Sequence, residues 1–285
     1  MKISYREEIY QLKPEYEFEL QEYFANREFN HFFIESSPKE LESVYLKIYF
    51  LDTETNPFSD YLKSIHANLI KQQTLKELDW LKAWIENLEA FEVCDGIWID
   101  PFPHKPLLEV KGAKKVFKII PGTAFGTGLH ATTQLAAKQM QELNFNDKVI
   151  TDVGCGTGIL ALLASHFGAS ETYCYDDDPM AIMKAKETLE MNKVTVTDCD
   201  TADLLANLPN IKVDIVIANI ICEVLIMLLE QDAFKNCLKE DSLVVFSGVS
   251  NNKREHMESH IEKHKFKILK HLNQGDWNSY LLSLA

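Results

Sequence analysis

Apolar strands alternate with helical segments throughout the second half of the chain, and this alternation is the feature that most restricts its fold. Each strand-like segment is followed by a helix-like one, with the strands at residues 148–153, 171–176, 213–219 and 242–248. Buried strands separated by helices form β-α-β units, which build a mainly parallel sheet with helices on both faces. Two final segments have the pattern of a closing antiparallel hairpin. We therefore expect an α/β fold with a doubly wound, mainly parallel sheet.

The N-terminal third contains shorter elements of both kinds. Strand-like runs occur there at 2–12, 29–34 and 44–50. Runs with helical spacing alternate with them, at 15–26, 58–71 and 79–91. This mixture predicts a smaller N-terminal α+β domain of ferredoxin-like type at residues 1–95. Residues 96–116 contain prolines and several lysines, and we expect them to form a linker. The α/β domain is then expected at residues 117–285.

The formal net charge of −14 is concentrated near the N-terminus, where residues 1–100 carry 10 Lys and Arg against 20 Asp and Glu. A negative surface repels nucleic acid and attracts a basic partner, so we expect a basic protein partner and no direct nucleic-acid binding. No stretch has the pattern of a signal peptide or a membrane span. Six cysteines occur singly, which argues against a zinc site and a disulfide framework. We expect a monomer in the reducing cytoplasm, with no metal.

Glycine is absent before Gly96, and six of the 11 glycines lie between residues 122 and 158. Glycine allows a ligand to approach the backbone closely, so the binding site is expected in this region. The strand at 148–153 runs into Gly154-Cys155-Gly156-Thr157-Gly158 and then into a helix. Backbone N–H groups and the start of this helix are expected to face the carboxyl end of the sheet, where such folds bind ligands.

Asp176 lies 22 residues after Gly154, at the end of the next strand, where a carboxylate can bind a ribose diol. The fingerprint of a nicotinamide dinucleotide requires glycine where Ile159 stands. Asp152 precedes the loop, and its charge would repel a pyrophosphate and attract a cation. S-adenosylmethionine carries a ribose, a sulfonium and an ammonium group, and so matches this pattern. An α/β domain that binds no nucleotide is the alternative.

Polar residues at two further places suggest a site. Thr132 and Thr133 stand at the start of a helix expected at 133–143, where their hydroxyls either cap the helix or contact a ligand. Asn219 ends a buried strand, and its amide, with the carbonyls that follow, can accept hydrogen bonds from an amine and orient its lone pair. A turn-forming asparagine is the alternative. His130 could act as a base or be structural.

Three histidines, His256, His260 and His264, recur every four residues. Such a row could bind a metal ion. Because the intervening Met257 and Ile261 are expected to be the buried positions, we interpret the histidines as part of a solvated helix face.

Several segments together resemble the ribosomal-protein methyltransferases of the PrmA type, which modify the eleventh protein of the large ribosomal subunit. They are PGTAFGTGLHATT at 121–133, DVGCGTG at 152–158, YDDDP at 175–179, ANII at 218–221 and FSGV at 246–249. The resemblance extends over most of the chain, including the acidic N-terminal domain, Glu77 to Trp84 and Trp277. The chain departs from the family pattern at Ile120, Leu129 and Ala131.

The resemblance implies an S-adenosylmethionine methyltransferase fold with cofactor contacts from Thr133, Gly154, Asp176 and Asn219. We add Gly156 and Phe125 to the cofactor-binding residues and assign Asn219 as the catalytic residue. The expected reaction is methyl transfer to lysine or N-terminal amines of a basic ribosomal protein. Two alternatives remain: methylation of another protein or a small molecule, and a ribosome-binding protein with this fold but no catalytic activity.

Overall fold

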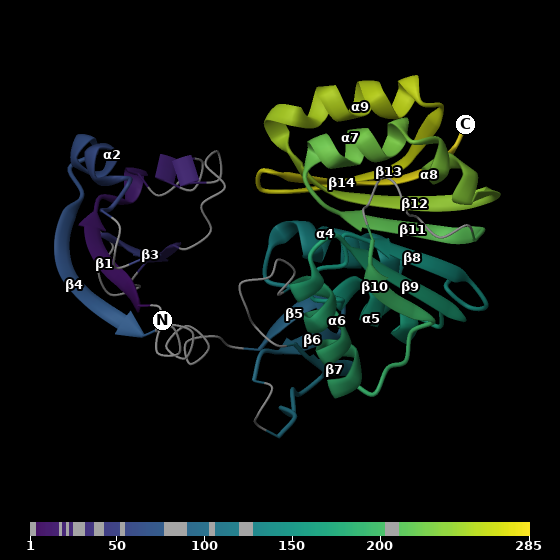
Figure 1. Cartoon of the computed structure of the whole chain (residues 1–285), viewed down its shortest axis with the longest axis horizontal. Coiled ribbons are helices and arrows are strands. Elements are labelled where there is room, and N and C mark those ends of the chain that lie inside the picture. The colour runs from purple at the N-terminus through teal and green to yellow at the C-terminus, as the bar shows by residue number, and fades with distance from the viewer. Residues whose placement is uncertain are drawn as a thin grey trace. The chain divides into compact units, whose positions relative to one another are not determined.

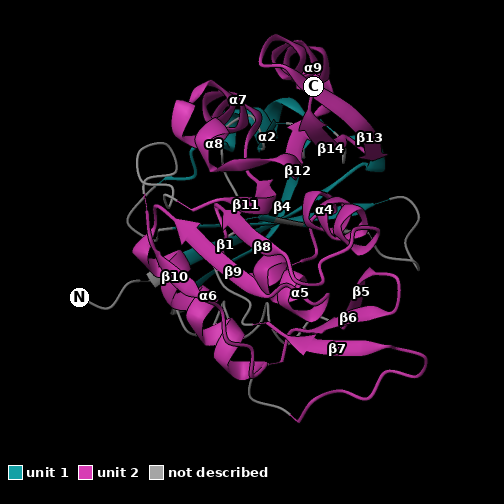
Figure 2. Cartoon of the chain, turned by 90° about the vertical axis from the view of Figure 1, so that its right-hand side faces the viewer, with its two compact units in different colours: residues 1–87 teal, residues 88–285 magenta. Residues whose placement is uncertain are grey.

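Two compact units make up the chain, residues 1–87 and residues 88–285 (Figure 2). The computed structural model describes residues 4–16, 19–20, 23–24, 32–36, 43–51, 55–76, 90–102, 106–119, 128–202 and 211–285. Each unit has a hydrophobic core of its own. In the part of the chain that is described, no helix is long and apolar enough to cross a membrane.

The first unit is built on a four-stranded antiparallel sheet in the order β2-β3-β1-β4. Its elements are β1 (Ser4–Leu12), the 3-10 turn η1 (Pro14–Tyr16), β2 (Phe32–Ser36), β3 (Val44–Leu51), α2 (Ser59–Ser64) and β4 (Asn68–Lys76). Residues 19–20 and 23–24, between β1 and β2, are also helical, and Leu20 and Phe24 are fully buried in the core. This strand order and the positions of the helices are those of the expected ferredoxin-like fold.

The helix expected at residues 58–71 is wrong in its second half. The helix α2 ends at Ser64, and His66 takes a positive φ of 56° that interrupts helical geometry. Residues 68–76 instead form β4, which pairs with β1 along most of its length. The hydrogen bonds offered by the edge of β1 therefore outweigh the helical spacing of this segment.

The expected linker at residues 96–116 contains two strands of the second unit. β5 (Phe91–Cys94), β6 (Ile97–Asp100) and β7 (Lys115–Lys118) form a three-stranded sheet. Ile97, Ile99 and Phe117 are buried in the same core as the large sheet. The prolines and most of the lysines lie in the connection between β6 and β7, and Lys115 begins β7. Composition alone therefore concealed two strands whose alternate residues are apolar. This sheet places the start of the second unit before the expected boundary at residue 95.

A seven-stranded sheet forms the centre of the second unit, in the order β10-β9-β8-β11-β12-β14-β13 (Figure 1). The strands are β8 (Val149–Val153), β9 (Glu171–Asp176), β10 (Asp198–Thr201), β11 (Val213–Asn219), β12 (Leu238–Ser250), β13 (Phe266–Gln274) and β14 (Trp277–Leu284). The first five are parallel, and β13 and β14 form the expected antiparallel hairpin. Sequence patterning missed β10 because three of its four residues are exposed.

Helices cover both faces of this sheet, which confirms the predicted fold class. One face carries α4 (Ala131–Gln141), α5 (Ile159–His166) and α6 (Pro179–Met191), and the other carries α7 (Cys222–Glu230), α8 (Asp232–Cys237), the short η2 (Asn251–Lys253) and α9 (Arg254–Lys263). The central strand β11 contributes to both cores: Ile215 and Ile217 pack toward α4–α6, whereas Val216 and Ala218 pack toward α7–α9. This two-sided burial explains its continuous apolar sequence.

Candidate functional site

The register of the parallel strands brings three of the expected site residues to one edge of the sheet. Val153 pairs with Tyr175 on one side and with Ala218 on the other. The next residues of these strands are Gly154, Asp176 and Asn219, which therefore meet at the carboxyl edge. The strand order reverses between β8 and β11, and a doubly wound sheet opens a crevice for ligands at this position.

The loop after β8 folds tightly onto its neighbours. Gly154 has a φ of 71°, and a Cβ atom there would lie 2.4 Å from Cγ2 of Ile220. Glycine is thus required for this turn. The N–H groups of Gly154 and Cys155 donate to the carbonyl of Tyr175, at 2.8 and 3.0 Å, and the N–H of Gly158 donates to the carbonyl of Cys155 at 2.8 Å. These donors stabilise the loop itself, so they do not form the ligand cradle that the sequence predicted.

Asp176 is fixed in place by its own backbone surroundings. Its Oδ2 atom accepts a hydrogen bond from the N–H of Gly156 at 2.9 Å, and its Oδ1 atom accepts one from the N–H of Asp178 at 3.1 Å. Burial raises the pKa of this carboxyl, and the two N–H donors oppose the rise. Each oxygen keeps acceptor capacity beyond these bonds. The carboxylate can therefore accept hydrogen bonds from two hydroxyl groups of a ligand without moving.

Asp152 has a different role from the one that its sequence position suggested. It is almost fully buried, and its Oδ2 atom accepts a hydrogen bond from the N–H of Ala161 in α5 at 3.0 Å. Burial raises its pKa to about 7. The carboxyl is thus partly protonated at neutral pH, and it connects β8 to α5. It does not supply the full negative charge beside the loop that we expected to attract a cation.

The side chains of Asn219 and Thr133 meet across the edge of the sheet. Nδ2 of Asn219 donates to Oγ1 of Thr133 at 3.2 Å, and both residues are buried. Oδ1 of Asn219 is also buried, and it has no hydrogen-bond partner among the residues that the structure describes. An unsatisfied buried acceptor is costly unless a ligand supplies a donor. This atom therefore fits a ligand N–H group at the carboxyl edge.

The helix α4 is capped by His130 rather than by a threonine hydroxyl. The ring Nδ1 of His130 accepts a hydrogen bond from the N–H of Thr132 at 3.4 Å. The ring also packs edge-to-face against Trp277, with 4.9 Å between the ring centroids. Burial lowers the pKa of His130. The hydroxyl of Thr133 is therefore not needed as a cap and contacts Asn219 instead. His130 fixes the start of α4, the helix that carries Thr133.

Two residues of β12 support the site and were missed as site residues by the sequence reasoning. Oγ of Ser247 donates to the carbonyl of Thr132 at 2.8 Å and thereby holds α4 against the sheet. A Cβ atom at Gly248 would lie 2.2 Å from the carbonyl oxygen of Ile220. Glycine at this position lets the backbone after Asn219 lie directly against β12. The FSGV segment quoted for the family resemblance was the signal that could have identified them.

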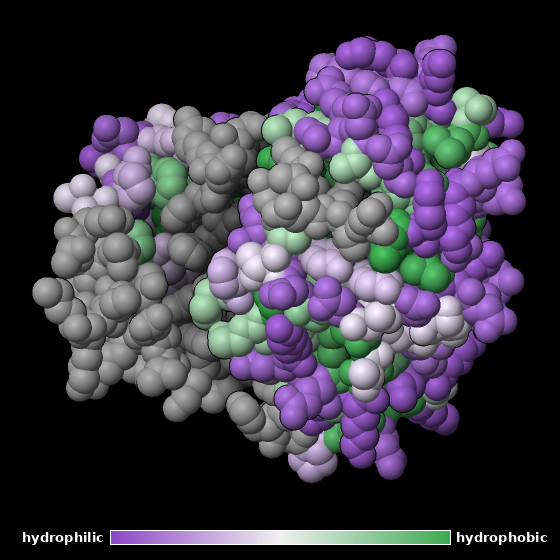
Figure 3. Space-filling view, turned by 45° about the vertical axis from the view of Figure 1, so that its right-hand side comes forward, coloured by the Kyte–Doolittle hydropathy of each residue, from purple (hydrophilic) through white to green (hydrophobic). Residues whose placement is uncertain are grey.

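Other expected features lie outside the crevice or outside the described residues. Phe125 belongs to residues 120–127 and lies outside the described part of the chain, as does the segment from Glu77 to Trp84. His256 and His260 are on α9, whose surface at the top of Figure 3 is hydrophilic. His264 does not belong to this solvated face: it follows the last residue of α9, its Nε2 is buried, and its Nδ1 lies 3.3 Å from Nζ of Lys235 in α8. The described residues include no group of three or more His, Cys, Asp or Glu side chains placed to hold a metal ion.

The arrangement fits S-adenosylmethionine. Asp176 offers a carboxylate with spare acceptor capacity for the ribose hydroxyls, and its bond from the N–H of Gly156 places that carboxylate beside the glycine loop. The unpartnered Oδ1 of Asn219 lies at the same edge of the sheet. Of the residues assigned from the sequence, Asp176 and Asn219 thus bring a carboxylate and an unpartnered amide oxygen to the same edge of the sheet.

Comparison with known proteins identifies the family. The family model of ribosomal protein L11 methyltransferase (PrmA) matches residues 16–283. The ribosomal protein L11 methyltransferase of Thermosipho melanesiensis is 33% identical over 283 residues, covering 99% of this chain and 99% of that protein. The Thermotoga maritima protein of the same name is 34% identical over 275 residues, covering 96% of this chain and 97% of that protein.

A solved structure agrees with these sequence comparisons. The ribosomal protein L11 methylase of Lactobacillus delbrueckii subsp. bulgaricus has a TM-score of 0.64 and 27% sequence identity, and the alignment covers 69% of this chain and 99% of that chain. The resemblance inferred from the sequence is confirmed, and with it the methyltransferase class that uses S-adenosylmethionine. The chain belongs to the ribosomal protein L11 methyltransferase family.

Proposed function

We propose that this chain methylates amine nitrogens of a ribosomal protein of the L11 kind, at lysine side chains, at the N-terminal amine, or at both. The observation that carries this proposal is the amide oxygen of Asn219, which is buried at the carboxyl edge of the sheet with no partner among the described residues. The names of the relatives supply the class of substrate. An amine is a chemical group that could satisfy this acceptor and then accept a methyl group.

The cofactor half of the site is formed by the loop after β8 and by Asp176. Bound S-adenosylmethionine supplies an electrophilic methyl group on a positively charged sulfur. Asp176 binds the ribose hydroxyls and so fixes the position of the cofactor relative to Asn219. Holding two reactants in line can lower a barrier by about 7–11 kcal/mol, which makes positioning the main contribution of the protein. The positive φ angles of Gly154 and Gly156, 71° and 54°, shape this loop, and these two residues are the proposed backbone contacts of the cofactor.

The amine half of the site is formed by Asn219 and the residues that follow it. Oδ1 of Asn219 accepts a hydrogen bond from an N–H of the amine and so directs the nitrogen lone pair toward the methyl group. The amine must lose a proton first, from a pKa of about 10.4 for lysine or about 7.8 for an N-terminal amine. Ile221, two residues after Asn219, is 58% exposed. Its apolar surface favours the uncharged amine, which lowers the pKa of that amine.

The N-terminal unit is proposed to recognise the protein substrate. Residues 1–100 carry most of the negative charge of the chain, and a protein that binds ribosomal RNA is expected to be basic. The second unit holds every described residue assigned to the chemistry, so we propose that a monomer is sufficient for catalysis. We place the reaction in the reducing cytoplasm, where the six cysteines remain free thiols.

The proposal is tested by incubating the protein with S-adenosylmethionine that carries a labelled methyl group and with a ribosomal-protein extract. One labelled band of the size of the L11-type protein, with label on lysine or on the N-terminal residue, is expected. Label on several proteins or on a small molecule would indicate the alternative substrates. No transfer at all would indicate a binding protein without catalytic activity. Asn219→Ala should abolish most of the label, and Asn252→Ala, at an exposed asparagine of η2, is the matched control.

A further inference from the structure

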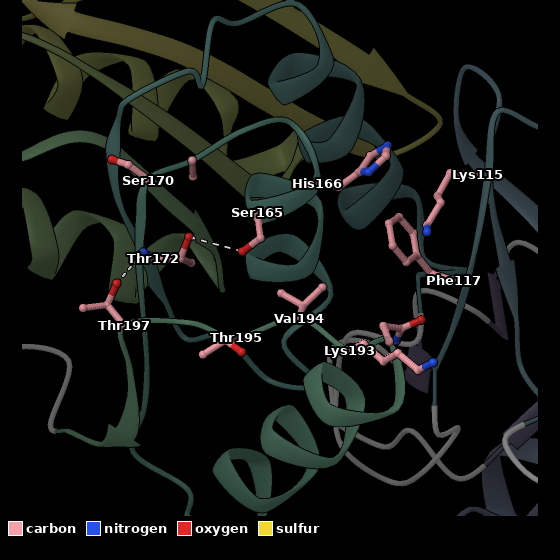
Figure 4. A pocket seen from close by; sticks show the side chains of 12 residues that line it. Lys115, Phe117, Ser165, His166, Ser170, Thr172, Lys193, Val194, Thr195 and Thr197 are labelled. Carbon is pink, nitrogen blue, oxygen red and sulfur yellow. Dashed lines mark hydrogen bonds between the residues drawn. The ribbon is translucent and has the colours of Figure 1, made fainter.

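A second hollow of about 380 Å³ lies in the second unit, at the edge of the sheet opposite the candidate site. Residues from β7, the end of α5, the start of β9 and the segment after α6 line it (Figure 4). Thr172 is the second residue of β9, whereas Asp176 is the last, so the strand separates this hollow from the cofactor crevice. The proposed methyl transfer gives it no role.

The charge of this hollow differs from that of the chain as a whole. Lys115 and Lys193 line it, and no aspartate or glutamate does so among the described residues. Both lysines are exposed, and neither forms an ion pair with any residue that the structure describes. A lining that contains lysines and no acid is unexpected in a chain with a net charge of −14. The charged side chains that line the hollow are therefore positive, on a protein that is acidic as a whole.

The ammonium group of Lys115 is held at one side of the hollow. Its Nζ atom lies 5.2 Å from the ring centroid of Phe117, which is buried and forms part of the floor. His166 packs edge-to-face on the same ring, with 5.2 Å between the ring centroids. A cation over an aromatic face is attracted by the ring, so this contact limits where the lysine can point. Figure 4 shows the three side chains together on one side of the hollow.

Hydroxyl groups line the opposite side. Oγ of Ser165 and Oγ1 of Thr172 lie 3.3 Å apart and share one hydrogen bond. Oγ1 of Thr197 accepts a hydrogen bond from the N–H of Thr172 at 3.1 Å, so its own hydroxyl hydrogen can point into the hollow. One hydroxyl hydrogen of the Ser165 and Thr172 pair is likewise available. The wall thus offers O–H donors opposite the ammonium groups.

Asn192 lines the hollow but is occupied by structural bonds. Its Nδ2 atom donates to the carbonyls of Lys118 and Thr188, both at 2.7 Å, and its Oδ1 atom accepts from the N–H of Lys118 at 2.9 Å. These bonds join β7 to the end of α6 and hold the two lysine-bearing segments at a fixed separation. The hollow is therefore a built feature of the fold rather than a gap between independent loops.

We propose that this hollow binds a phosphate group. Ammonium groups on one side and hydroxyl donors on the other match an oxyanion that has only acceptors to offer. Inorganic phosphate, a small phosphorylated molecule or a nucleic-acid backbone could supply this group. The net charge of −14 repels a long polyanion more than a single phosphate. The small ligand is therefore the source that the charge distribution favours.

Titration of the full-length protein with inorganic phosphate, followed by calorimetry, tests the proposal. Lys115→Gln and Lys193→Gln should each weaken phosphate binding by about threefold, and the double variant by about tenfold or more, because each removes one nearby positive charge. Lys267→Gln, at an exposed lysine of β13, is the matched control and should bind phosphate like the unchanged protein. S-adenosylmethionine affinity and the midpoint of thermal unfolding should be the same in all four variants, because the hollow lies away from the crevice.

A second titration with a short single-stranded RNA distinguishes the two kinds of source. If the protein binds the RNA, releases it when phosphate is added and loses this binding in the double variant, these results together would support a backbone phosphate as the ligand. Phosphate binding without RNA binding would support a small phosphorylated ligand. The proposal is overturned if phosphate does not bind at millimolar concentrations, or if the double variant binds it as tightly as the Lys267→Gln control.

Discussion

Asn219 and Thr133 provide the sharpest test of the proposed site because the structure predicts how their effects combine. Asn219→Ala removes the acceptor for the substrate amine, and the loss of one positioned polar group typically lowers a catalytic rate by about 100-fold, or about 2.7 kcal/mol. Thr133→Val removes only the hydroxyl that accepts the 3.2 Å hydrogen bond from Nδ2 of Asn219. A typical hydrogen bond contributes about 0.5–1.5 kcal/mol, so this variant should lose about threefold to tenfold in rate.

The double variant should be no slower than Asn219→Ala alone. If Thr133 acts by orienting Asn219, removing it has no further effect once the amide is gone. The methyl-transfer rate is measured at saturating cofactor and substrate, and the dissociation constant of S-adenosylmethionine is measured separately by calorimetry. Thermal unfolding of each variant shows whether the protein remains folded, since both substitutions break the same buried bond from opposite sides.

Two results would contradict this reasoning. If Asn219→Ala lowers the methyl-transfer rate and the cofactor affinity by the same factor, Asn219 is a cofactor ligand and not the acceptor for the amine. Additive losses in the double variant would mean that Thr133 contacts a ligand directly, which was the alternative that its sequence position left open. Either result would leave the fold and the family assignment unchanged.

Four further results are expected at other positions. Asp176→Ala should weaken S-adenosylmethionine binding by about tenfold or more in calorimetry, since each hydrogen bond to a charged carboxylate contributes about 1.5–3 kcal/mol, and unchanged affinity would reject the ribose assignment. Gly248→Ala should lower both the unfolding midpoint and the activity, because its Cβ would lie 2.2 Å from the carbonyl oxygen of Ile220; a fully active, stable variant would contradict this. Burial raises the pKa of Asp152 to about 7, so the folded state binds more protons than the unfolded one, and stability to urea should fall as the pH rises from about 4 through about 7. Asp152→Asn should remove that fall, and an unaltered pH profile would assign the slope to another group. A chain of residues 88–285 should bind S-adenosylmethionine normally but methylate its protein substrate slowly and with little effect of salt; protein methylation equal to that of the intact chain at low salt would show that the N-terminal unit does not recognise the substrate.

The large sheet could be predicted because its strands are buried on both faces. The segment at 213–219 is almost continuously apolar, and both cores receive its side chains. Parallel strands also align their carboxyl ends, so Gly154, Asp176 and Asn219 could be expected to meet from their positions at strand ends alone. The pairing of Asn219 with Ser247 follows from the same register. Ser247 lies in the FSGV segment of the family resemblance, and that segment was its signal in the sequence.

Edge strands and contacts between elements were harder to predict because their stability comes from distant partners. β4 and β10 carry mostly exposed side chains, so their pairing with β1 and β9 has no apolar pattern in the sequence. β6 appeared to be part of a linker until its packing against the large core was visible. A truncation at Lys114 would therefore remove β5 and β6 and expose part of that core, whereas one at residue 88 keeps the unit whole.

The reason for excluding a dinucleotide also changes when the structure is considered. The sequence reasoning relied on Ile159, which stands where the fingerprint requires glycine, and on the charge of Asp152. The carboxyl of Asp152 is buried with a pKa of about 7 and bonds to α5, so its charge is the weaker of these two reasons. The loop offers a stronger reason. The N–H groups of Gly154, Cys155 and Gly158 donate to carbonyls, and that of Gly156 donates to Asp176. A pyrophosphate needs several backbone donors at this place, and four of the loop's donors are already used. A ligand that binds through its ribose hydroxyls needs none of these four N–H groups. The N–H of Gly156 instead holds the carboxylate of Asp176, and that carboxylate accepts the hydrogen bonds from the ribose hydroxyls.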